Sequence, residues 1–423
     1  MNRSLARQRP FTLLVVAAAL AALLLLLTAC SGAKQAEGVK PGQYRLTLDF
    51  PVGQLPVGLD LVEEGGVITA YLVNGGNRTR AESTTVEGNR LTLAFPSYDS
   101  TLVAEAQPDG SLSGTATLRR KDGPVPVKFA AVPGQAWRFY ETPAAATGAI
   151  GGTWLLETQG DEPEKGLLLV KETNGVLEGT IQFPTGDVRY LAGQVSGDEF
   201  ALSTFDGNQG SVWRGKRFAD GTLRGENFGA TAKTPTKWIA HPQSAAPADQ
   251  VVAIGEEKPP VERIDFTFPD ANGKPVSLSD PQYKGKVVVV AIGGTWCPNC
   301  HDEALFLAPY AKRRKAEGLE VIGLQLEYTD DPARSAAQSR RFAQRYNIEY
   351  PLLIAGKSGA EGSKKALPQL DGVRVYPTTL FIDRKGRLRT IHTGYAGPAT
   401  GELNKKATAE FDALVSELLA EKA

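Results

Sequence analysis

The stretch VVVVAIGGTWCPNCHDE, residues 287–303, constrains this chain more than any other part of its sequence. Its first six residues are apolar and mostly branched, which is typical of a central parallel strand buried on both faces. Gly293 and Gly294 permit the chain to turn out of that strand. A segment of helical composition follows. The pattern therefore predicts a strand, a tight turn and a helix that begins near Cys297.

Two cysteines three residues apart, Cys297 and Cys300, lie at this predicted helix start. Unpaired amides and the positive end of the helix dipole favour a thiolate at Cys297, so we expect its pKa to fall. Cys300 lies one turn further along and can close a disulfide with Cys297. The arrangement indicates a redox dithiol in which an exposed Cys297 attacks and a buried Cys300 resolves.

A zinc site is the alternative, because zinc proteins use the same spacing. The chain has three cysteines and three histidines. Cys30 belongs to a targeting segment described below, so no second cysteine pair completes a four-cysteine site. His301 would point away from the pair, and we expect its side chain to be exposed on the helix. We therefore predict no metal and no cofactor.

Three motifs in the last two fifths of the chain define a family resemblance. Residues 296–300 read WCPNC, Glu303 follows one turn later, and residues 376–379 read YPTT before a short apolar strand. Together they resemble the TlpA/ResA-like thioredoxin-fold proteins, which are related to the AhpC/TSA redoxins. The resemblance covers residues 261–423 and implies an α/β thioredoxin-fold domain.

The resemblance also implies roles for residues around the dithiol. Pro377 matches the cis-proline of the thioredoxin fold, which exposes the preceding backbone beside the cysteines. The Tyr376 backbone is then expected to pair with an extended substrate, and Trp296 to pack beside the sulfurs. The loop of residues 393–401 is expected near the site as a flexible rim.

A buried resolving thiol needs a base. Thioredoxin itself has an acid in the strand before its first cysteine, where this chain has Ala291. TlpA/ResA-like proteins instead carry a glutamate at the place of Glu303. We therefore expect Glu303 to accept the proton of Cys300 and to have a raised pKa. The alternative is an ordinary surface glutamate.

The N-terminus carries a targeting signal. Three arginines precede an apolar stretch at residues 11–27, and Thr-Ala-Cys follows at 28–30. This resembles a bacterial lipoprotein signal at residues 1–29, with lipid on Cys30 and a tether over residues 30–41; an uncleaved anchor and an ordinary secretory signal are the alternatives. Each places the rest of the chain outside the cytoplasm. Ser31 after the cysteine resembles an outer-membrane sorting signal.

Two β-rich repeats are predicted between the tether and the redox domain, at residues 42–141 and 150–241. Short alternating runs separated by Gly-Gly, Asn-Gly and Asp-Gly indicate antiparallel hairpins. Motifs of the first segment recur in order about 110 residues later, for example Asp109-Gly110 and Asp220-Gly221, which indicates duplication. Each repeat is expected to form a small barrel or sandwich, and residues 242–260 a second linker. A spacer, a client-binding module and a dimerisation module are the alternatives for their role.

These features predict an extracytoplasmic, membrane-tethered thiol–disulfide oxidoreductase that reduces or isomerises protein disulfides. A membrane partner that supplies electrons is implied by the resemblance alone. The balanced charge of 47 basic and 47 acidic residues gives no indication of nucleic-acid binding.

Two other functions stay open. A thiol peroxidase is one, although Gly294 and Val290 stand where a peroxiredoxin needs Thr or Ser and Pro. A surface-binding lipoprotein with an accessory redox domain is the other.

Overall fold

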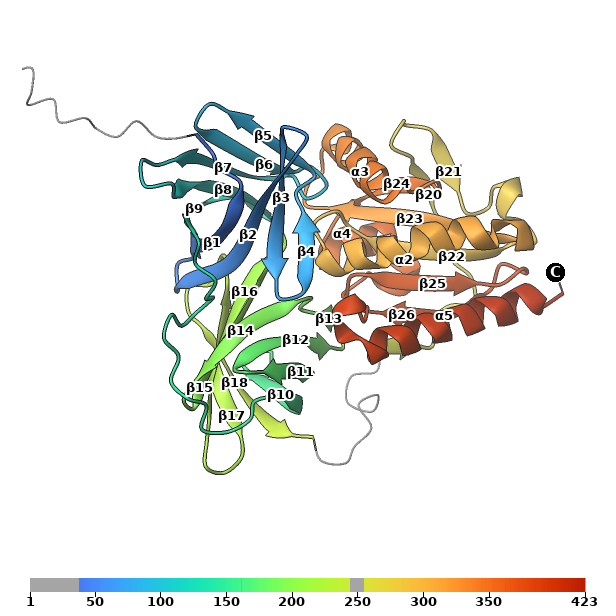
Figure 1. Cartoon of the computed structure of the whole chain (residues 1–423). Coiled ribbons are helices and arrows are strands. Elements are labelled where there is room, and N and C mark those ends of the chain that lie inside the picture. Colours follow the sequence, from blue (N-terminus) through green and yellow to red (C-terminus); the bar gives the residue numbers. More distant parts are fainter. Residues whose placement is uncertain (1–37, 161, 244–254, 423) are drawn as a thin grey trace, which may run out of the picture.

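The computed structural model describes residues 38–160, 162–243 and 255–422, which form three parts (Figure 1). We call them the N-terminal sheet, the barrel and the redox domain, and the first two together the β domains. The predicted signal segment and Cys30 lie outside the described residues. No helix in the described part of the chain is both long and apolar enough to span a bilayer.

The N-terminal sheet has nine antiparallel strands in the order β4-β3-β2-β1-β9-β8-β7-β6-β5. Glycines with positive φ, such as Gly66 (81°) and Gly88 (62°), make the hairpin turns that the sequence predicts. β4 and β5 are the two edge strands and do not pair with each other, so the sheet stays open. Its strands are β1 (Gly42–Asp49), β2 (Gln54–Glu64), β3 (Val67–Asn74), β4 (Asn77–Arg80), β5 (Ser83–Glu87), β6 (Arg90–Phe95), β7 (Ser100–Ala106), β8 (Leu112–Arg120) and β9 (Gly123–Pro133).

The barrel repeats the same strand order but closes, because β12 pairs with both β11 and β14. Strands β10–β12 of the barrel correspond to strands β1–β3 of the N-terminal sheet. Strands β14–β18 correspond to strands β5–β9. Closure by β12 with β14 has no counterpart in the N-terminal sheet, where β4 pairs with β3 instead. The strands are β10 (Gly152–Gln159), β11 (Lys165–Thr173), β12 (Val176–Phe183), β13 (Gly186–Asp187), β14 (Leu191–Ser196), β15 (Glu199–Phe205), β16 (Gly210–Arg217), β17 (Leu223–Gly229) and β18 (Thr236–Pro242).

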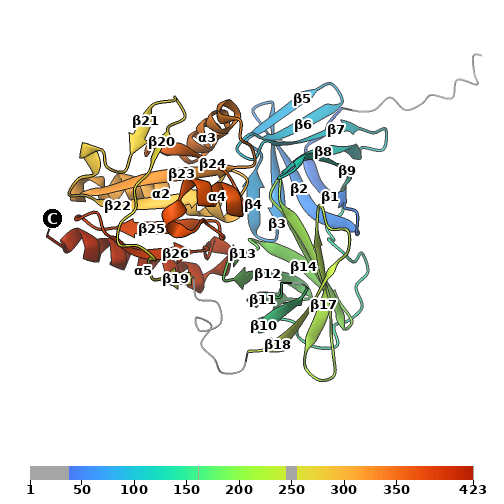
Figure 2. The same cartoon turned by 180° about the vertical axis from the view of Figure 1, so that it is seen from behind.

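The redox domain has a six-stranded mixed sheet in the order β19-β26-β25-β22-β23-β24. Both faces of its central strand are buried, as the apolar run predicts. One face packs on α2 and α5, and the other on the β20–β21 hairpin and the segment around α4 (Figures 1 and 2). The elements are β19 (Gly255–Glu257), β20 (Thr267–Pro269), β21 (Pro275–Ser277), β22 (Val287–Gly293), α2 (Pro298–Arg314), β23 (Leu319–Glu327), α3 (Pro332–Tyr346), β24 (Leu352–Lys357), α4 (Ala360–Ala366), β25 (Thr378–Ile382), β26 (Leu388–Thr393) and α5 (Glu402–Ala420).

The predicted fold class, two β-rich repeats followed by an α/β thioredoxin-like domain, is confirmed. One detail differs. Residues 255–257 are predicted as linker but form the edge strand β19, which pairs with β26. The segment Gly-Glu-Glu has no alternation of apolar and polar residues, so its sequence gives no sign of a strand. It is extended because it pairs with the free edge of β26.

The two β domains share one hydrophobic core. Phe205, Val212 and Phe228 of the barrel belong to the same buried cluster as the inward-facing residues of the N-terminal sheet. Arg138, in the connection between them, donates to Val73 O (2.9 Å) and Ser203 O (3.1 Å), one on each side. The β domains are therefore joined by an apolar interface.

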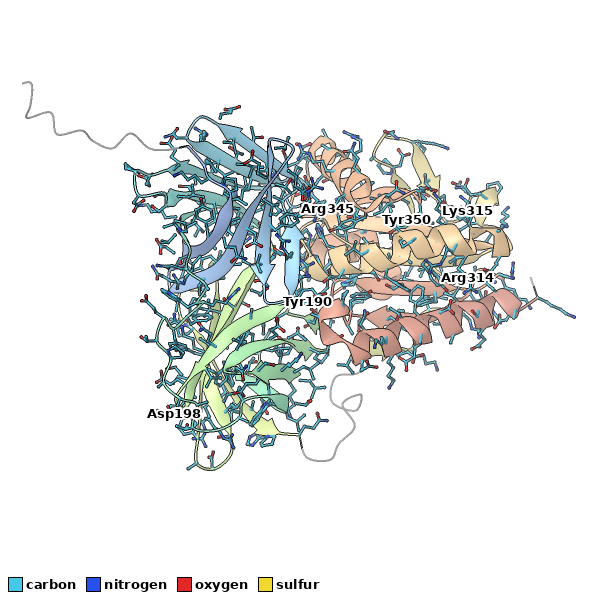
Figure 3. The ribbon with its side chains drawn as sticks, viewed as in Figure 1. Tyr190, Asp198, Arg314, Lys315, Arg345 and Tyr350 are labelled. Atoms are coloured by element: carbon cyan, nitrogen blue, oxygen red, sulfur yellow. The ribbon has the colours of Figure 1, made fainter. Side chains whose placement is uncertain are left out.

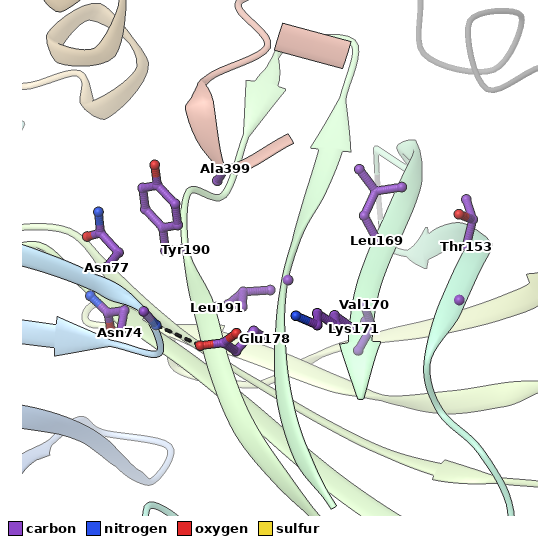
Figure 4. Close-up of a pocket in the computed structure, with 13 residues that line it drawn as sticks. Asn74, Asn77, Thr153, Leu169, Val170, Lys171, Glu178, Tyr190, Leu191 and Ala399 are labelled. Atoms are coloured by element: carbon purple, nitrogen blue, oxygen red, sulfur yellow. Dashed lines mark hydrogen bonds between the residues drawn. The ribbon is translucent and has the colours of Figure 1, made fainter. Parts of the chain in front are cut away.

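A groove of about 500 Å³ marks the place where all three parts of the chain meet. In Figure 4, Glu178 of β12 accepts a hydrogen bond from the amide of Gly76 in the β3–β4 turn, at 2.6 Å. Ala399 of the redox domain lies at the rim of the same groove. The redox domain thus contacts the barrel close to the junction of the two β domains.

Candidate active site

Cys297 is the N-cap residue of α2, as the sequence predicts. β22 ends at Gly293, and Pro298 occupies the first turn of the helix, where its missing N–H is not needed. The Cys297 Sγ accepts a hydrogen bond from the backbone N–H of Cys300, at 3.3 Å. This amide and the helix dipole both stabilise negative charge on Cys297. The two thiols are free and adjacent.

Cys300 has the environment of a thiol that stays protonated. Only 6% of its surface is exposed. Burial raises its pKa well above the ordinary value, and the neighbouring Cys297 and Glu303 raise it further. Cys300 therefore needs a proton acceptor before it can act as a nucleophile.

Glu303 lies one turn after Cys300 and is buried, with 8% of its surface exposed. Burial raises its pKa to about 7, and a hydrogen bond from the Thr379 hydroxyl (2.6 Å) opposes that rise. This geometry contradicts an ordinary surface glutamate. A carboxylate with a pKa near neutrality, beside a buried thiol, is suited to move a proton at physiological pH.

Trp296 and Tyr376 lie beside the dithiol from two different strand ends. The Tyr376–Pro377 peptide bond is cis, and Tyr376 O lies 3.5 Å from Cys297 Sγ, which donates to it. The indole of Trp296 stacks on Tyr328 (4.6 Å between ring centroids) and donates to Leu326 O (2.9 Å). The structure therefore gathers all predicted site residues except Cys30, which lies outside the described residues.

Cys297 is not exposed, which corrects one prediction. Only 3% of its surface reaches solvent. The β12–β13 turn lies against the dithiol, since a Cβ on Gly186 would stand 2.5 Å from Asn299 Oδ1. The β15–β16 turn also touches the site, where Gln209 Nε2 lies 3.5 Å from Trp296 O. The β domains thus cover the helix start that the sequence leaves open.

His301 is also buried, at 1% exposure, where the sequence predicts a solvent-exposed side chain. Its ring stacks on Tyr98 of the N-terminal sheet at 3.9 Å, and its two nitrogens hydrogen-bond with Tyr346 Oη (2.6 Å) and Thr295 O (2.7 Å). Burial lowers its pKa well below the ordinary value, so the imidazole is neutral. The described residues contain no group of three or more metal-ligating side chains.

The loop of residues 393–401 lies near the site, as expected, but it is packed against the barrel. Tyr395 and Ala396 are buried. The amide of Gly397 donates to Asp187, and Gln182 Nε2 lies 3.5 Å from Tyr395 O. The loop therefore belongs to the contact between the redox domain and the barrel.

Sequence analysis missed an ionic cluster beside the dithiol. Arg189 of the barrel forms a bidentate pair with Asp302 of α2 (2.9 and 2.7 Å) and a third contact with Asp206 (2.9 Å). Asp187 and Asp302 are both buried. Burial raises the pKa of Asp187 to about 7, and it also raises the pKa of Asp302. Nothing local in the sequence marks these residues, because they meet only when the domains pack.

The site defines a class of protein: a thioredoxin-fold domain with a dithiol at the start of its first long helix and a cis-proline beside it. The model of the AhpC/TSA family matches residues 261–391. Thioredoxin-like protein YneN of Bacillus subtilis is 32% identical over 130 residues, which are 31% of this chain and 68% of that protein. The thiol-disulfide oxidoreductase ResA of Bacillus thuringiensis is 29% identical over 140 residues, 33% of this chain and 69% of ResA.

Among solved structures, a thiol:disulfide interchange protein from Chlorobium tepidum aligns with a TM-score of 0.30 and 22% identity, covering 39% of this chain and 99% of that one. On the sequence comparisons, the chain belongs to the AhpC/TSA family, among its ResA-like members. The predicted class, a thiol–disulfide oxidoreductase, is confirmed. The family model does not extend into the β domains.

Proposed function

We propose that this chain is an extracytoplasmic, membrane-tethered enzyme that reduces or isomerises protein disulfides through Cys297 and Cys300. The observation that carries the proposal is the asymmetry of the two thiols. Cys297 Sγ accepts an amide hydrogen bond at a helix start, whereas Cys300 is held protonated beside Glu303. An attacking and a resolving thiol need these two environments.

The exchange proceeds in two steps. The Cys297 thiolate attacks one sulfur of a client disulfide, so that a mixed disulfide forms and the other client sulfur leaves as a thiolate. Glu303 then takes the proton of Cys300, whose sulfur attacks Cys297 Sγ. The client leaves as a dithiol, the enzyme holds a Cys297–Cys300 disulfide, and two electrons have passed to the client. In isomerisation, the client's own thiol attacks the mixed disulfide instead.

Glu303→Gln tests the second step separately from the first. The amide of this variant cannot accept a proton, so decay of a preformed mixed disulfide should slow by on the order of a hundredfold, as for loss of a general base, while the first attack stays within about twofold of the unmodified chain. In the unmodified chain the resolution rate should rise with pH up to about 7, where Glu303 loses its proton, and the variant should lack this rise. Equal decay rates would remove Glu303 from the mechanism.

The direction of electron flow is tested by the reduction potential of the cysteine pair, equilibrated with defined thiol buffers. A reductase should show a value near that of thioredoxin, roughly −270 to −230 mV. A value near roughly −120 mV would make the chain a disulfide-forming oxidant. If the chain is a reductase, a reductant must regenerate the dithiol, because reduction of each client consumes two electrons; we propose a membrane partner as that electron donor.

Membrane tethering is the part of the proposal that rests on the sequence alone. The apolar stretch at residues 11–27 and Thr-Ala-Cys at 28–30 support lipid attachment at Cys30 and a position in the cell envelope, facing the periplasm or the exterior. The mass of the mature chain tests it: a lipoprotein should lack residues 1–29 and carry lipid mass on Cys30, and Cys30→Ala should remove that lipid mass. An unmodified chain that keeps residues 1–29 and carries no lipid mass would favour the uncleaved anchor.

A further inference from the structure

Three turns of the β domains surround the dithiol. The turn after β12 reaches Asn299 through Gly186, and the β15–β16 turn reaches Trp296 through Gln209. The β6–β7 turn places Tyr98 on His301. The contacted residues therefore lie both before and after Cys297 in the chain. What remains beside Trp296 is a slot of about 20 Å³, lined by both the N-terminal sheet and the redox domain, which is room for about one water molecule.

Arg189 joins the three turns at a single point. It pairs with Asp302 next to the dithiol, with Asp206 of the β15–β16 turn, and its Nη1 lies 3.2 Å from the Tyr98 hydroxyl. Tyr98 in turn donates to Asp206 at 2.8 Å. The side chain of Arg189 is 17% exposed. Loss of Arg189 would leave two buried carboxylates without their cation.

Apart from the Tyr98–His301 stack and the buried Tyr395 and Ala396, the contacts described between the β domains and the redox domain are polar. Gln338 of α3 donates to Pro96 O (2.9 Å) and Ser97 O (2.7 Å), and Arg345 pairs with Glu82 at 3.4 Å. Among the described residues, none of the buried hydrophobic clusters combines β-domain and redox-domain side chains. Interfaces of this polar kind resemble transient ones, and domains joined in this way are expected to move.

We propose that the β domains are a detachable cap on the dithiol, positioned by Arg189, and that the cap determines which disulfides reach Cys297. In the closed form, small disulfides reach the sulfur through local opening of the seam. A protein disulfide needs the same face of the redox domain that the cap occupies, so it reacts after the cap detaches. This inference rests on the proposed disulfide exchange, which it makes selective for clients that displace the cap.

The test measures how fast Cys297 of the reduced full chain reacts with two reagents. Iodoacetamide is the small one, and a maleimide carrying a long polyethylene glycol chain is the bulky one. Peptide mass spectrometry reads the label on Cys297 in each case. The ratio of bulky to small rates reports access and cancels changes in the reactivity of the thiolate itself.

The variants are Arg189→Ala and a matched control, Arg314→Ala. Arg314 is also 17% exposed and ion-paired, but with Glu317 and Asp412 of the redox domain. Figure 3 shows Arg314 at the end of the domain away from the β domains, whereas Arg345 lies at the end that faces them. Arg189→Ala should raise the bulky-to-small ratio about tenfold or more, because breaking a buried pair is strongly destabilising; Arg314→Ala should leave it unchanged.

Two results would overturn the cap. For each reagent, the rate at Cys297 of the unmodified chain is divided by its rate with a free thiol. The first contradicting result is that this relative rate is the same for the bulky reagent and for iodoacetamide. The other is an equal ratio in both variants. If Arg189→Ala does not fold, Arg189→Lys keeps the charge but loses the bidentate geometry, and should raise the ratio less. If the ratio rises but the chain reduces no protein disulfide in either form, the proposed function fails and the cap stands.

Discussion

The β domains meet each other and the redox domain through two different kinds of interface. Between the N-terminal sheet and the barrel, Phe205, Val212 and Phe228 complete one apolar core. Between the β domains and the redox domain, the contacts are ion pairs, carbonyl hydrogen bonds and one stacked Tyr–His pair. Opening an apolar interface exposes apolar surface to water, whereas ions and polar groups regain their hydration when a polar interface opens. The first interface should therefore be permanent and the second reversible.

The largest effect should come from Phe205→Ala, which breaks the apolar interface. Phe205 is fully buried, so the change should lower the free energy of unfolding by about 3–5 kcal/mol. Phe218 of the barrel is 38% exposed and gives the control: Phe218→Ala should cost less than about 1 kcal/mol. Denaturant unfolding followed by circular dichroism measures both. Equal losses would show that the shared core does not hold the β domains together.

A smaller effect is expected from Gln338→Ala at the polar interface. The change leaves the buried carbonyl of Ser97 and the half-buried carbonyl of Pro96 without their donor, at a cost of about 1–3 kcal/mol to the closed form. The bulky-to-small labelling ratio at Cys297 should therefore rise roughly tenfold, with little change in global unfolding. Gln344 is exposed on the same helix, so Gln344→Ala should change neither quantity.

The polar interface should also weaken as pH rises. The docked pKa of Asp187 is raised to about 7 by burial and by the Asp302 charge, against hydrogen bonds from Arg189 N and Gly397 N and the Arg189 charge. Because docking raises the pKa of this carboxyl, the docked form is stabilised at any pH below the pKa of the undocked carboxyl. This stabilisation is lost as pH rises through the docked pKa of about 7. The labelling ratio should increase several-fold between about pH 5 and pH 8. Asp187→Asn should flatten that profile; an unchanged profile would exclude Asp187 as its source.

The smallest effect should follow Arg334→Ala. Arg334 pairs with Asp99 across the polar interface, but both side chains are exposed by more than a third. Exposed pairs contribute about 0–1 kcal/mol, so the labelling ratio should rise about fivefold at most and less at high salt. Arg340→Ala, on an exposed arginine that contacts Ala271 within the redox domain, provides the control. A larger effect than that of Gln338→Ala would reverse the ranking of the two contacts.

Local patterns were enough to predict the redox domain and much of its site. A buried strand, a turn and a helix start are properties of neighbouring residues, so Cys297, Cys300 and the buried Glu303 could be located from spacing and resemblance. The two β repeats were also predictable, since hairpin signals recur at a constant offset. The roles assigned to these site residues stay predictions.

The cover over the site was not predictable, because it depends on residues far apart in the chain. Arg189 and Asp302, or Tyr98 and His301, are separated by a hundred residues or more, and nothing near each one marks its partner. His301 therefore looked like a surface side chain and Cys297 like an exposed thiol. The closed barrel and the open N-terminal sheet were not distinguishable from the sequence for the same reason. They have the same strand order, and the barrel differs only in the pairing of β12 with β14.

The strand β19 has a consequence for how clients compete. Only twelve residues, 243–254, lie between the end of β18 in the barrel and the start of β19 in the redox domain. A short covalent connection keeps two surfaces at an effective concentration on the order of millimolar. A free client at a much lower concentration must therefore bind the redox face far more tightly than the cap does, or bind the cap as well. Lengthening this connection should favour clients without altering a single contact in either interface.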